Sequence, residues 1–117
     1  MRDFKKLLIW QLGMEIVDKV YEIVPSLPSE ERYGIRSQMT RSAVSIPGNI
    51  AEGSAKTSQK DYARYCEISL GSTFELETQL LVVQRRKWVE EEKVSELLVM
   101  ISNEQKMLSS FIDKLKA

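Results

Sequence analysis

A run of small residues near the middle of the chain constrains its fold more than any other feature. Residues 41–53 read RSAVSIPGNIAEG, and a second group of small residues opens the segment 71–80, GSTFELETQL. Small side chains let two helix backbones approach more closely than leucine-lined helices can, and close packing then requires the match to be kept. The two segments therefore predict a pair of helices in close contact.

Apolar residues recur every three or four positions along four stretches of the chain, which is the pattern of amphipathic helices. Short connections between four such helices favour an up-down-up-down four-helix bundle, so the predicted fold class is all-α, with one domain spanning residues 1–117. In the last helix, Gln105 interrupts the apolar seam. The predicted helices cover about residues 7–24, 30–53, 58–86 and 90–115.

Pro47 falls inside the second predicted helix, where it removes a backbone hydrogen bond to the Ala43 carbonyl and costs about 3 kcal/mol. A kinked helix is favoured because the apolar spacing continues on both sides of the proline; two shorter helices joined by a Pro-Gly turn are the alternative. Ser29 is the expected N-cap of this helix, and Thr57 or Ser58 that of the next. The seam of the second helix is Met39, Ala43, Ile46 and Ile50. The seam of the third helix is Tyr62, Cys66, Ser69, Thr73, Leu76, Leu80 and Val83.

If the second and third helices form a hairpin, residues whose numbers sum to about 114 lie opposite each other. This register places Ser45 opposite Ser69 and Gly48 opposite Cys66, so that bulky side chains at these small positions are expected to overpack. It also brings Arg36 and Arg41 near Glu75 and Glu77, where a bidentate ion pair would fix the register.

Asn49 is expected on the polar side of the second helix, where a helix-helix hydrogen bond is favoured over contact with a ligand. The residues expected to mediate helix packing are Arg41, Ser45, Pro47, Gly48, Asn49, Ser69, Gly71, Glu75 and Glu77.

The first helix carries more apolar surface than one bundle needs. Ten of the sixteen residues from Ile9 to Val24 are apolar, whereas a core-facing helix needs about three in seven. Leaving the outer stripe in water would forfeit about 7 to 15 kcal/mol. We therefore expect a cyclic homo-oligomer whose interface uses Trp10, Met14, Val17, Tyr21 and Val24.

Several classes of activity are disfavoured by composition. The chain has no histidine, and Cys66 lies on an apolar seam without a base to activate it. Glu75 and Glu77 fall on different helical faces and are not expected to share a metal ion. Residues 48–56 superficially resemble a phosphate-binding loop, but the lysine is misplaced and no strand precedes the segment. We expect no enzyme activity, no cofactor, no metal and no small-molecule substrate.

The sequence also indicates the cellular compartment to expect. Neither a secretory signal nor a membrane-spanning run is present, so the expected compartment is the cytoplasm, with no membrane partner.

Charge is balanced overall, with seventeen basic and seventeen acidic residues. In the predicted topology, however, both termini and the turn between the second and third helices share one end, which has eight basic and four acidic residues, or about +4. The opposite end has about −1. An incidental surface dipole is the alternative interpretation. The candidate nucleic-acid-binding residues at the positive end are Lys5, Lys6, Lys56, Lys60, Arg64, Lys114 and Lys116.

Several motifs together resemble a bacterial family: the four-helix-bundle proteins encoded in intervening sequences of 23S ribosomal RNA genes, which are related to accessory proteins of diversity-generating retroelements. The resemblance implies a homopentameric barrel of bundles. For the retroelement relatives it also implies a basic scaffold that binds a reverse transcriptase and nucleic acid, and it implies no enzymatic activity. Unlike those basic relatives, this chain is formally neutral. The motifs are Trp10 with its helix, residues 31–34 (ERYG), 37–38 (SQ), 41–53, 71–72 (GS) and 75–77 (ELE).

Two functions fit these observations. The first is a non-catalytic oligomeric scaffold whose basic end engages RNA or a ribonucleoprotein, such as a reverse transcriptase complex. The second is a protein-only adaptor with no role in binding nucleic acid.

Overall fold

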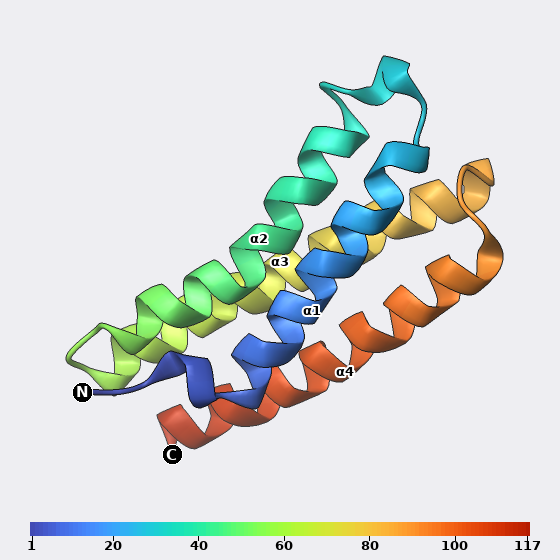
Figure 1. Ribbon diagram of the computed structural model, residues 1–117. Coiled ribbons are helices and arrows are strands. Elements are labelled where there is room, and N and C mark those ends of the chain that lie inside the picture. Colours follow the sequence, from blue (N-terminus) through green and yellow to red (C-terminus); the bar gives the residue numbers. More distant parts are fainter.

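The computed structural model describes residues 1–117 and contains four α-helices and no strands. Consecutive helices run in opposite directions, and both termini lie at the same end as the turn between the second and third helices (Figure 1). The up-down-up-down topology predicted from apolar spacing is therefore confirmed. The helices are α1 (Leu8–Ile23), α2 (Ile35–Ser54), α3 (Gln59–Arg86) and α4 (Glu91–Lys116).

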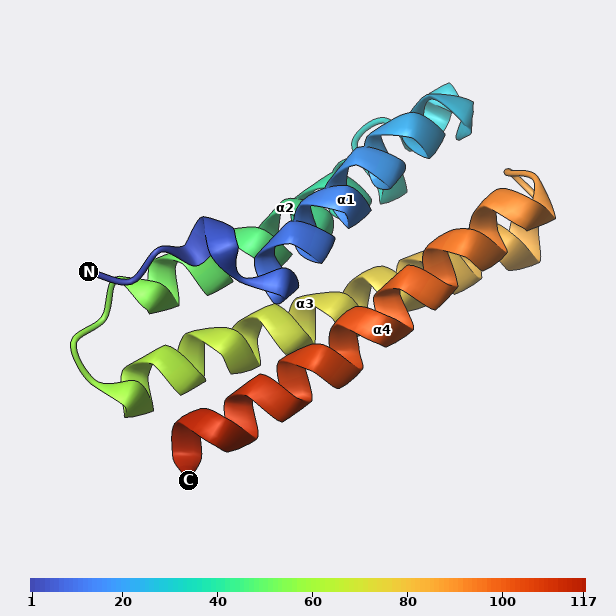
Figure 2. The same cartoon turned by 60° about the horizontal axis from the view of Figure 1, so that its bottom comes forward.

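The four helices form an elongated bundle of 43 × 24 × 20 Å. Helix α1 lies beside α2 and α4, and α3 lies beside the same two helices, so that each helix has two neighbours (Figures 1 and 2). Figure 2 shows α1 and α2 together as one layer across from α3 and α4. None of the helices combines the length and the apolar character that crossing a membrane requires.

The core follows the predicted seams. All four predicted seam residues of α2 are fully buried. On α3 the seam of Tyr62, Cys66, Ser69, Thr73, Leu76, Leu80 and Val83 is buried throughout. Because side chains on these seams recur every three or four residues, they point to one side of each helix and meet at the bundle axis.

Helix α2 is continuous through Pro47, so the alternative of two shorter helices is wrong. The proline ring is buried, and a Cβ built on Gly13 of α1 would lie 3.5 Å from the Pro47 Cβ. Burial of the ring against α1 offsets the hydrogen bond that proline cannot donate.

The start of α2 differs from the prediction. The helix begins at Ile35, about five residues later than expected, and Ser29 does not cap it, because Ser29 to Glu31 form a separate short 3-10 turn. The Glu31 side chain supplies the missing acceptor, since its Oε1 receives a hydrogen bond from the Ile35 backbone N–H at 3.4 Å. Helix α3 is capped as predicted, by Ser58, whose hydroxyl accepts from the Asp61 N–H at 3.1 Å.

A glycine lies where α2 and α3 approach each other closely, but it is Gly53 and not the predicted Gly48 or Gly71. A Cβ on Gly53 would lie 2.8 Å from the Tyr65 Cβ and 3.2 Å from the Tyr62 carbonyl oxygen. Gly48 and Gly71 are exposed, and a Cβ at either position would meet no atom within 4 Å. The prediction that these two glycines mediate packing is wrong, because both occupy outward-facing turns of their helices.

The contrast between these glycines predicts opposite effects of one substitution. We expect Gly48→Ala to raise the free energy of unfolding by about 0.5 to 1 kcal/mol, since alanine restricts the unfolded chain and favours helix. Gly53→Ala should lower it by about 1 to 3 kcal/mol, because the new methyl group meets α3. Urea denaturation of both variants beside the unsubstituted protein measures the two signs, and equal signs would contradict this account.

Candidate functional site

The predicted basic residues gather at the end that holds both termini and the α2–α3 turn (Figure 1). Arg2 connects the N-terminal segment to the α2–α3 turn. Its guanidinium donates to the carbonyl oxygens of Ser54 and Lys56 and lies 4.8 Å from the centre of the Tyr62 ring. Lys56 lies 4.8 Å above the Tyr65 ring, which orients its ammonium by a cation-π contact.

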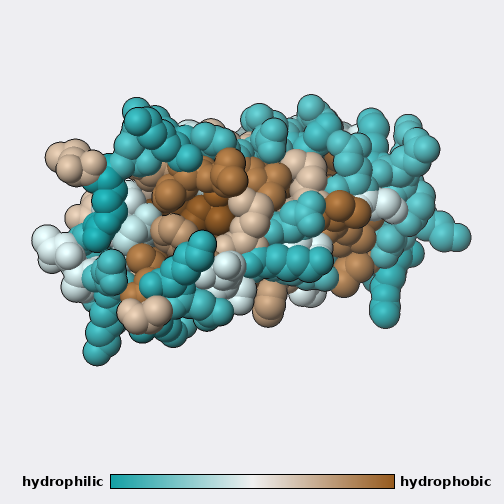
Figure 3. Space-filling model, turned by 90° about the horizontal axis from the view of Figure 1, so that it is seen from below, coloured by the Kyte–Doolittle hydropathy of each residue, from teal (hydrophilic) through white to brown (hydrophobic).

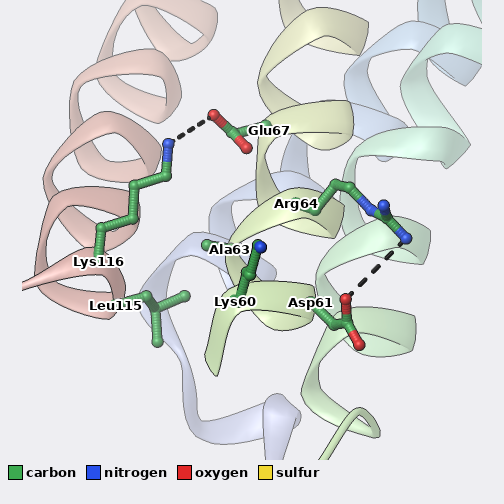
Figure 4. A pocket seen from close by; sticks show the side chains of 7 residues that line it. All are labelled: Lys60, Asp61, Ala63, Arg64, Glu67, Leu115 and Lys116. Carbon is green, nitrogen blue, oxygen red and sulfur yellow. Dashed lines mark hydrogen bonds and ion pairs between the residues drawn. The ribbon is translucent and has the colours of Figure 1, made fainter. Parts of the chain in front are cut away.

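Two of the seven predicted binding residues have acidic partners within the chain. Lys116 of α4 forms a 2.9 Å salt bridge with Glu67 of α3, and Arg64 lies 4.0 Å from Asp61 (Figure 4). These pairs line a hollow of about 390 Å³ between the start of α3 and the end of α4.

The remaining five residues form no salt bridge, and all but the half-buried Lys56 are exposed. We call these five the free lysines: Lys5, Lys6, Lys56, Lys60 and Lys114. The structure therefore brings the predicted residues to one end and leaves most of them available to an anionic partner.

The outer stripe of α1 is only partly enclosed by its own subunit. Trp10, Val17 and Val24 are half-buried against the core, while Met14 and Tyr21 keep exposed fractions of 39% and 54%. The prediction that α1 carries surplus apolar surface is thus confirmed for the two outermost residues of the stripe.

A second apolar area lies between the start of α1 and the end of α4. Leu8 is 68% exposed, and it lines a hollow of about 430 Å³ together with Leu7, Ile9, Met107 and Phe111. Lys6 and Lys114 border the same hollow. Figure 3 shows apolar side chains gathered between hydrophilic ones on the face of the bundle seen from below.

Small polar residues join α2 to α3, but in a shifted register. Ser45 shares a 2.8 Å hydrogen bond with Ser72, and the buried Ser69 hydroxyl donates to the Ile46 carbonyl at 2.8 Å. Ser45 therefore bonds Ser72 and not the predicted Ser69, which faces the adjacent Ile46 instead, and Gly48 does not pack beside Cys66. The numbers of facing residues sum to 115 and 117 in these pairs, which is one to three more than the predicted sum of about 114.

The predicted ion pairs between α2 and α3 are absent. Ser42 donates to the Glu75 carboxylate at 2.6 Å, and Gln105 of α4 donates to Glu77 at 2.8 Å. Arg36 instead donates to the Val24 carbonyl at 3.1 Å, and Arg41 is exposed. Glu75 and Glu77 do lie on different faces as predicted, one turned to α2 and the other to α4.

Asn49 acts within α2 and not between helices, which corrects the prediction for this residue. Its amide donates to the Ser45 hydroxyl at 2.8 Å and to the Ser45 carbonyl at 2.9 Å. Because Ser45 in turn bonds Ser72, Asn49 orients the hydroxyl that crosses to α3.

Cys66 is completely buried on the seam of α3. Burial, followed by the nearby Glu67 charge, raises the pKa of the Cys66 thiol to about 12, so that the thiolate is disfavoured. A packed thiol was predicted at this position.

Sequence reasoning missed Glu104, a fully buried carboxyl in the middle of α4. Neither carboxyl oxygen has a hydrogen-bond partner, and a Cβ on Gly13 of α1 would lie 3.1 Å from Glu104 Oε2. Burial alone raises the pKa of this carboxyl to about 8, with no neighbouring charge contributing. The sequence does indicate this burial, because Glu104 occupies the seam position between Ile101 and Leu108. Gln105, which was predicted to interrupt the seam, is only half-buried.

Comparisons with known proteins identify a matching family and a similar fold. Residues 5–110 match the family model described as 23S rRNA-intervening sequence protein. The fold is similar to the crystal structure of a protein with unknown function from the S23 ribosomal protein family of Bacteroides thetaiotaomicron, with a TM-score of 0.83, 23% identity, and coverage of 90% of this chain and 98% of that one. A search of curated proteins finds no match.

The buried Glu104 predicts an unusual dependence of stability on pH. Its pKa in the folded protein, about 8, exceeds the ordinary value of 4.5, so folding retains a proton that the unfolded chain releases. The free energy of unfolding should therefore fall by about 3 to 4 kcal/mol as pH rises from about 4.5 to about 8, and this contribution should then level off.

Glu104→Gln should remove this fall, while Glu92→Gln at an exposed position of the same helix should retain it. Urea denaturation across this pH range measures both. A slope that is the same in all three proteins would show that Glu104 does not titrate as the buried geometry requires.

Proposed function

The chain belongs to the 23S rRNA-intervening sequence protein family, and we propose that it is a non-catalytic homo-oligomeric scaffold whose basic end engages structured RNA or a ribonucleoprotein. The observation that carries this proposal is the gathering of the free lysines, none of which has an acidic partner, around one end of the bundle. Unpaired ammonium groups keep their field available to a phosphate backbone, whereas groups in salt bridges do not.

Oligomerisation would multiply this charge. The exposed Met14 and Tyr21 lie one heptad apart on α1, so a second subunit that covered the stripe would remove both from water. A cyclic arrangement places the same end of every subunit on one face. A homopentamer, which the family resemblance implies, would then collect about twenty positive charges on that face.

A ribonucleoprotein such as a reverse transcriptase complex is the partner that this arrangement suits best. The apolar hollow between α1 and α4 lies beside Lys6 and Lys114, so a single partner would meet apolar and basic groups together. The same hollow also supports the second candidate, a protein-only adaptor, because apolar side chains are buried at protein interfaces and not at a phosphate backbone.

RNA binding separates the two candidates. We expect the purified oligomer to bind a fluorescein-labelled structured RNA with an affinity that falls roughly 10³-fold between about 50 and 200 mM salt. Lys56→Glu combined with Lys60→Glu should weaken binding and flatten the salt dependence, because these changes reverse charge at the basic end. Fluorescence anisotropy measures both effects.

The matched control is Lys93→Glu combined with Lys106→Glu, which reverses the same number of exposed charges on α4 outside the basic end. Equal weakening in both variants would favour non-specific attraction. Absence of RNA binding at low salt would leave the protein-only adaptor.

Self-association can be tested separately. We expect Met14→Glu combined with Tyr21→Glu to dissociate the oligomer into monomers, since two charges would be buried without partners in each interface. Val99→Glu, which changes an apolar α4 residue with an exposed fraction of 59%, serves as the control and should leave the oligomer intact. Sedimentation velocity reports the masses, and an unsubstituted protein that is already monomeric would refute the scaffold.

A further inference from the structure

A second concentration of positive charge lies at the opposite end of the bundle from the free lysines. Where α1 ends and α2 begins, a hollow of about 340 Å³ is lined by Val24, Arg32, Arg36, Ser37, Thr40 and Arg41, which we call the arginine hollow. This region lies at the end of Figure 1 remote from both termini. The lining contains three guanidinium groups and two hydroxyls, and no acidic side chain.

The three arginines are not neutralised within the molecule. Its four salt bridges use Lys19, Arg64 and Lys116 as the cations, and none involves an arginine of the hollow. Three like charges around one concavity repel each other, and an arginine without a carboxylate partner offers its full set of terminal N–H donors. An oxyanion in the hollow would satisfy these donors and relieve the repulsion.

The hollow is also partly organised in advance. The Arg36 Nε donates to the Val24 carbonyl at 3.1 Å, which fixes the stem of this side chain and leaves its two terminal nitrogens free to bind an anion. The Thr40 hydroxyl donates to the Arg36 carbonyl, one helical turn earlier in α2, at 2.9 Å, and this bond fixes the position of the hydroxyl oxygen. The Ser37 hydroxyl, in contrast, forms no hydrogen bond within the protein and can donate to a ligand.

Two neighbouring carboxylates are engaged elsewhere. Glu31 accepts from the Ile35 N–H at the start of α2. Glu75 lines the adjacent hollow, to which Arg41 also contributes, and it accepts from Ser42 at 2.6 Å. Neither lines the arginine hollow, so an incoming anion would not have to displace a carboxylate.

From this geometry we propose that the arginine hollow binds a phosphate group, held by Arg32, Arg36 and Arg41 with Ser37 as an additional donor. Guanidinium forks match the spacing of phosphate oxygens and bind them through paired hydrogen bonds. The phosphate can belong to a small phosphate compound or to a nucleic-acid backbone. The site is separate from the basic end and does not depend on the function proposed above.

Isothermal titration calorimetry with inorganic pyrophosphate tests the site. Ionic strength is held constant, because changes in screening would otherwise mimic binding. We expect saturable binding with a dissociation constant on the order of 1 mM or below. Arg32→Gln combined with Arg41→Gln should weaken it at least about tenfold. Both side chains are exposed, so the fold should be retained, as circular dichroism can verify.

The matched control is Arg85→Gln combined with Arg86→Gln, which removes two exposed arginines from the same end of the bundle. This variant should bind pyrophosphate like the unsubstituted protein. Equal weakening in the two double variants, no effect of the Arg32 and Arg41 changes, or no saturable binding up to about 10 mM pyrophosphate would overturn the proposal.

A second arm identifies the source of the phosphate. If the hollow receives a nucleic-acid backbone, the Arg32 and Arg41 double variant should also bind the labelled structured RNA more weakly than the Arg85 and Arg86 control. If it receives a small phosphate compound, RNA binding should be equal in the two variants while pyrophosphate binding differs. Loss of RNA binding only in the Lys56 and Lys60 variant would place the RNA contact at the basic end. The pyrophosphate titration would then decide whether the arginine hollow binds phosphate.

Discussion

The close approach of α2 to α3 is the contact on which the rest of the bundle depends. The Ser69 hydroxyl bonds the Ile46 carbonyl within the core, and Gly53 leaves no room for a Cβ against the Tyr62 backbone. These contacts hold two helix axes close together along a boundary that apolar side chains alone would keep wider. Since each of the other helices packs against this pair, its separation and register determine where the termini and the inter-helix turns come to lie.

The fold was largely predictable from sequence because helix-period apolar spacing reports burial directly. The seams of α2 and α3 were identified residue by residue, and Pro47 was correctly kept inside its helix. The register between those helices was not predictable to better than one to three positions, because the turn that sets it contributes no periodic signal. The start of α2 was misplaced for a related reason, since a Ser-Glu-Glu segment suits both a 3-10 turn and a first helical turn.

Polar residues within the bundle were predicted less well than apolar ones. The predicted hairpin register placed Glu75 and Glu77 near two arginines and suggested ion pairs. Instead, the two carboxylates accept hydrogen bonds from the neutral side chains of Ser42 and Gln105. Glu104 was missed because charged residues are assumed to face solvent, although its seam position indicated burial. Gly13 explains how the core accommodates it, since a side chain there would occupy the space of the carboxyl.

Net charge describes this molecule poorly, because local pairing decides which charges an approaching partner meets. At the end with the termini, Lys116 and Arg64 have carboxylate neighbours, so an approaching anion meets mainly the free lysines. At the opposite end, where a net charge of about −1 was predicted, three arginines line one hollow whose lining contains no carboxylate. Screening by salt limits the reach of exposed charges to about 8 to 10 Å, so such a cluster acts on a ligand in contact with it whatever the total charge of its end. Both ends of a formally neutral bundle can therefore attract anions, the first through several separated lysines that suit an extended backbone and the second through converging guanidinium groups that suit a single phosphate.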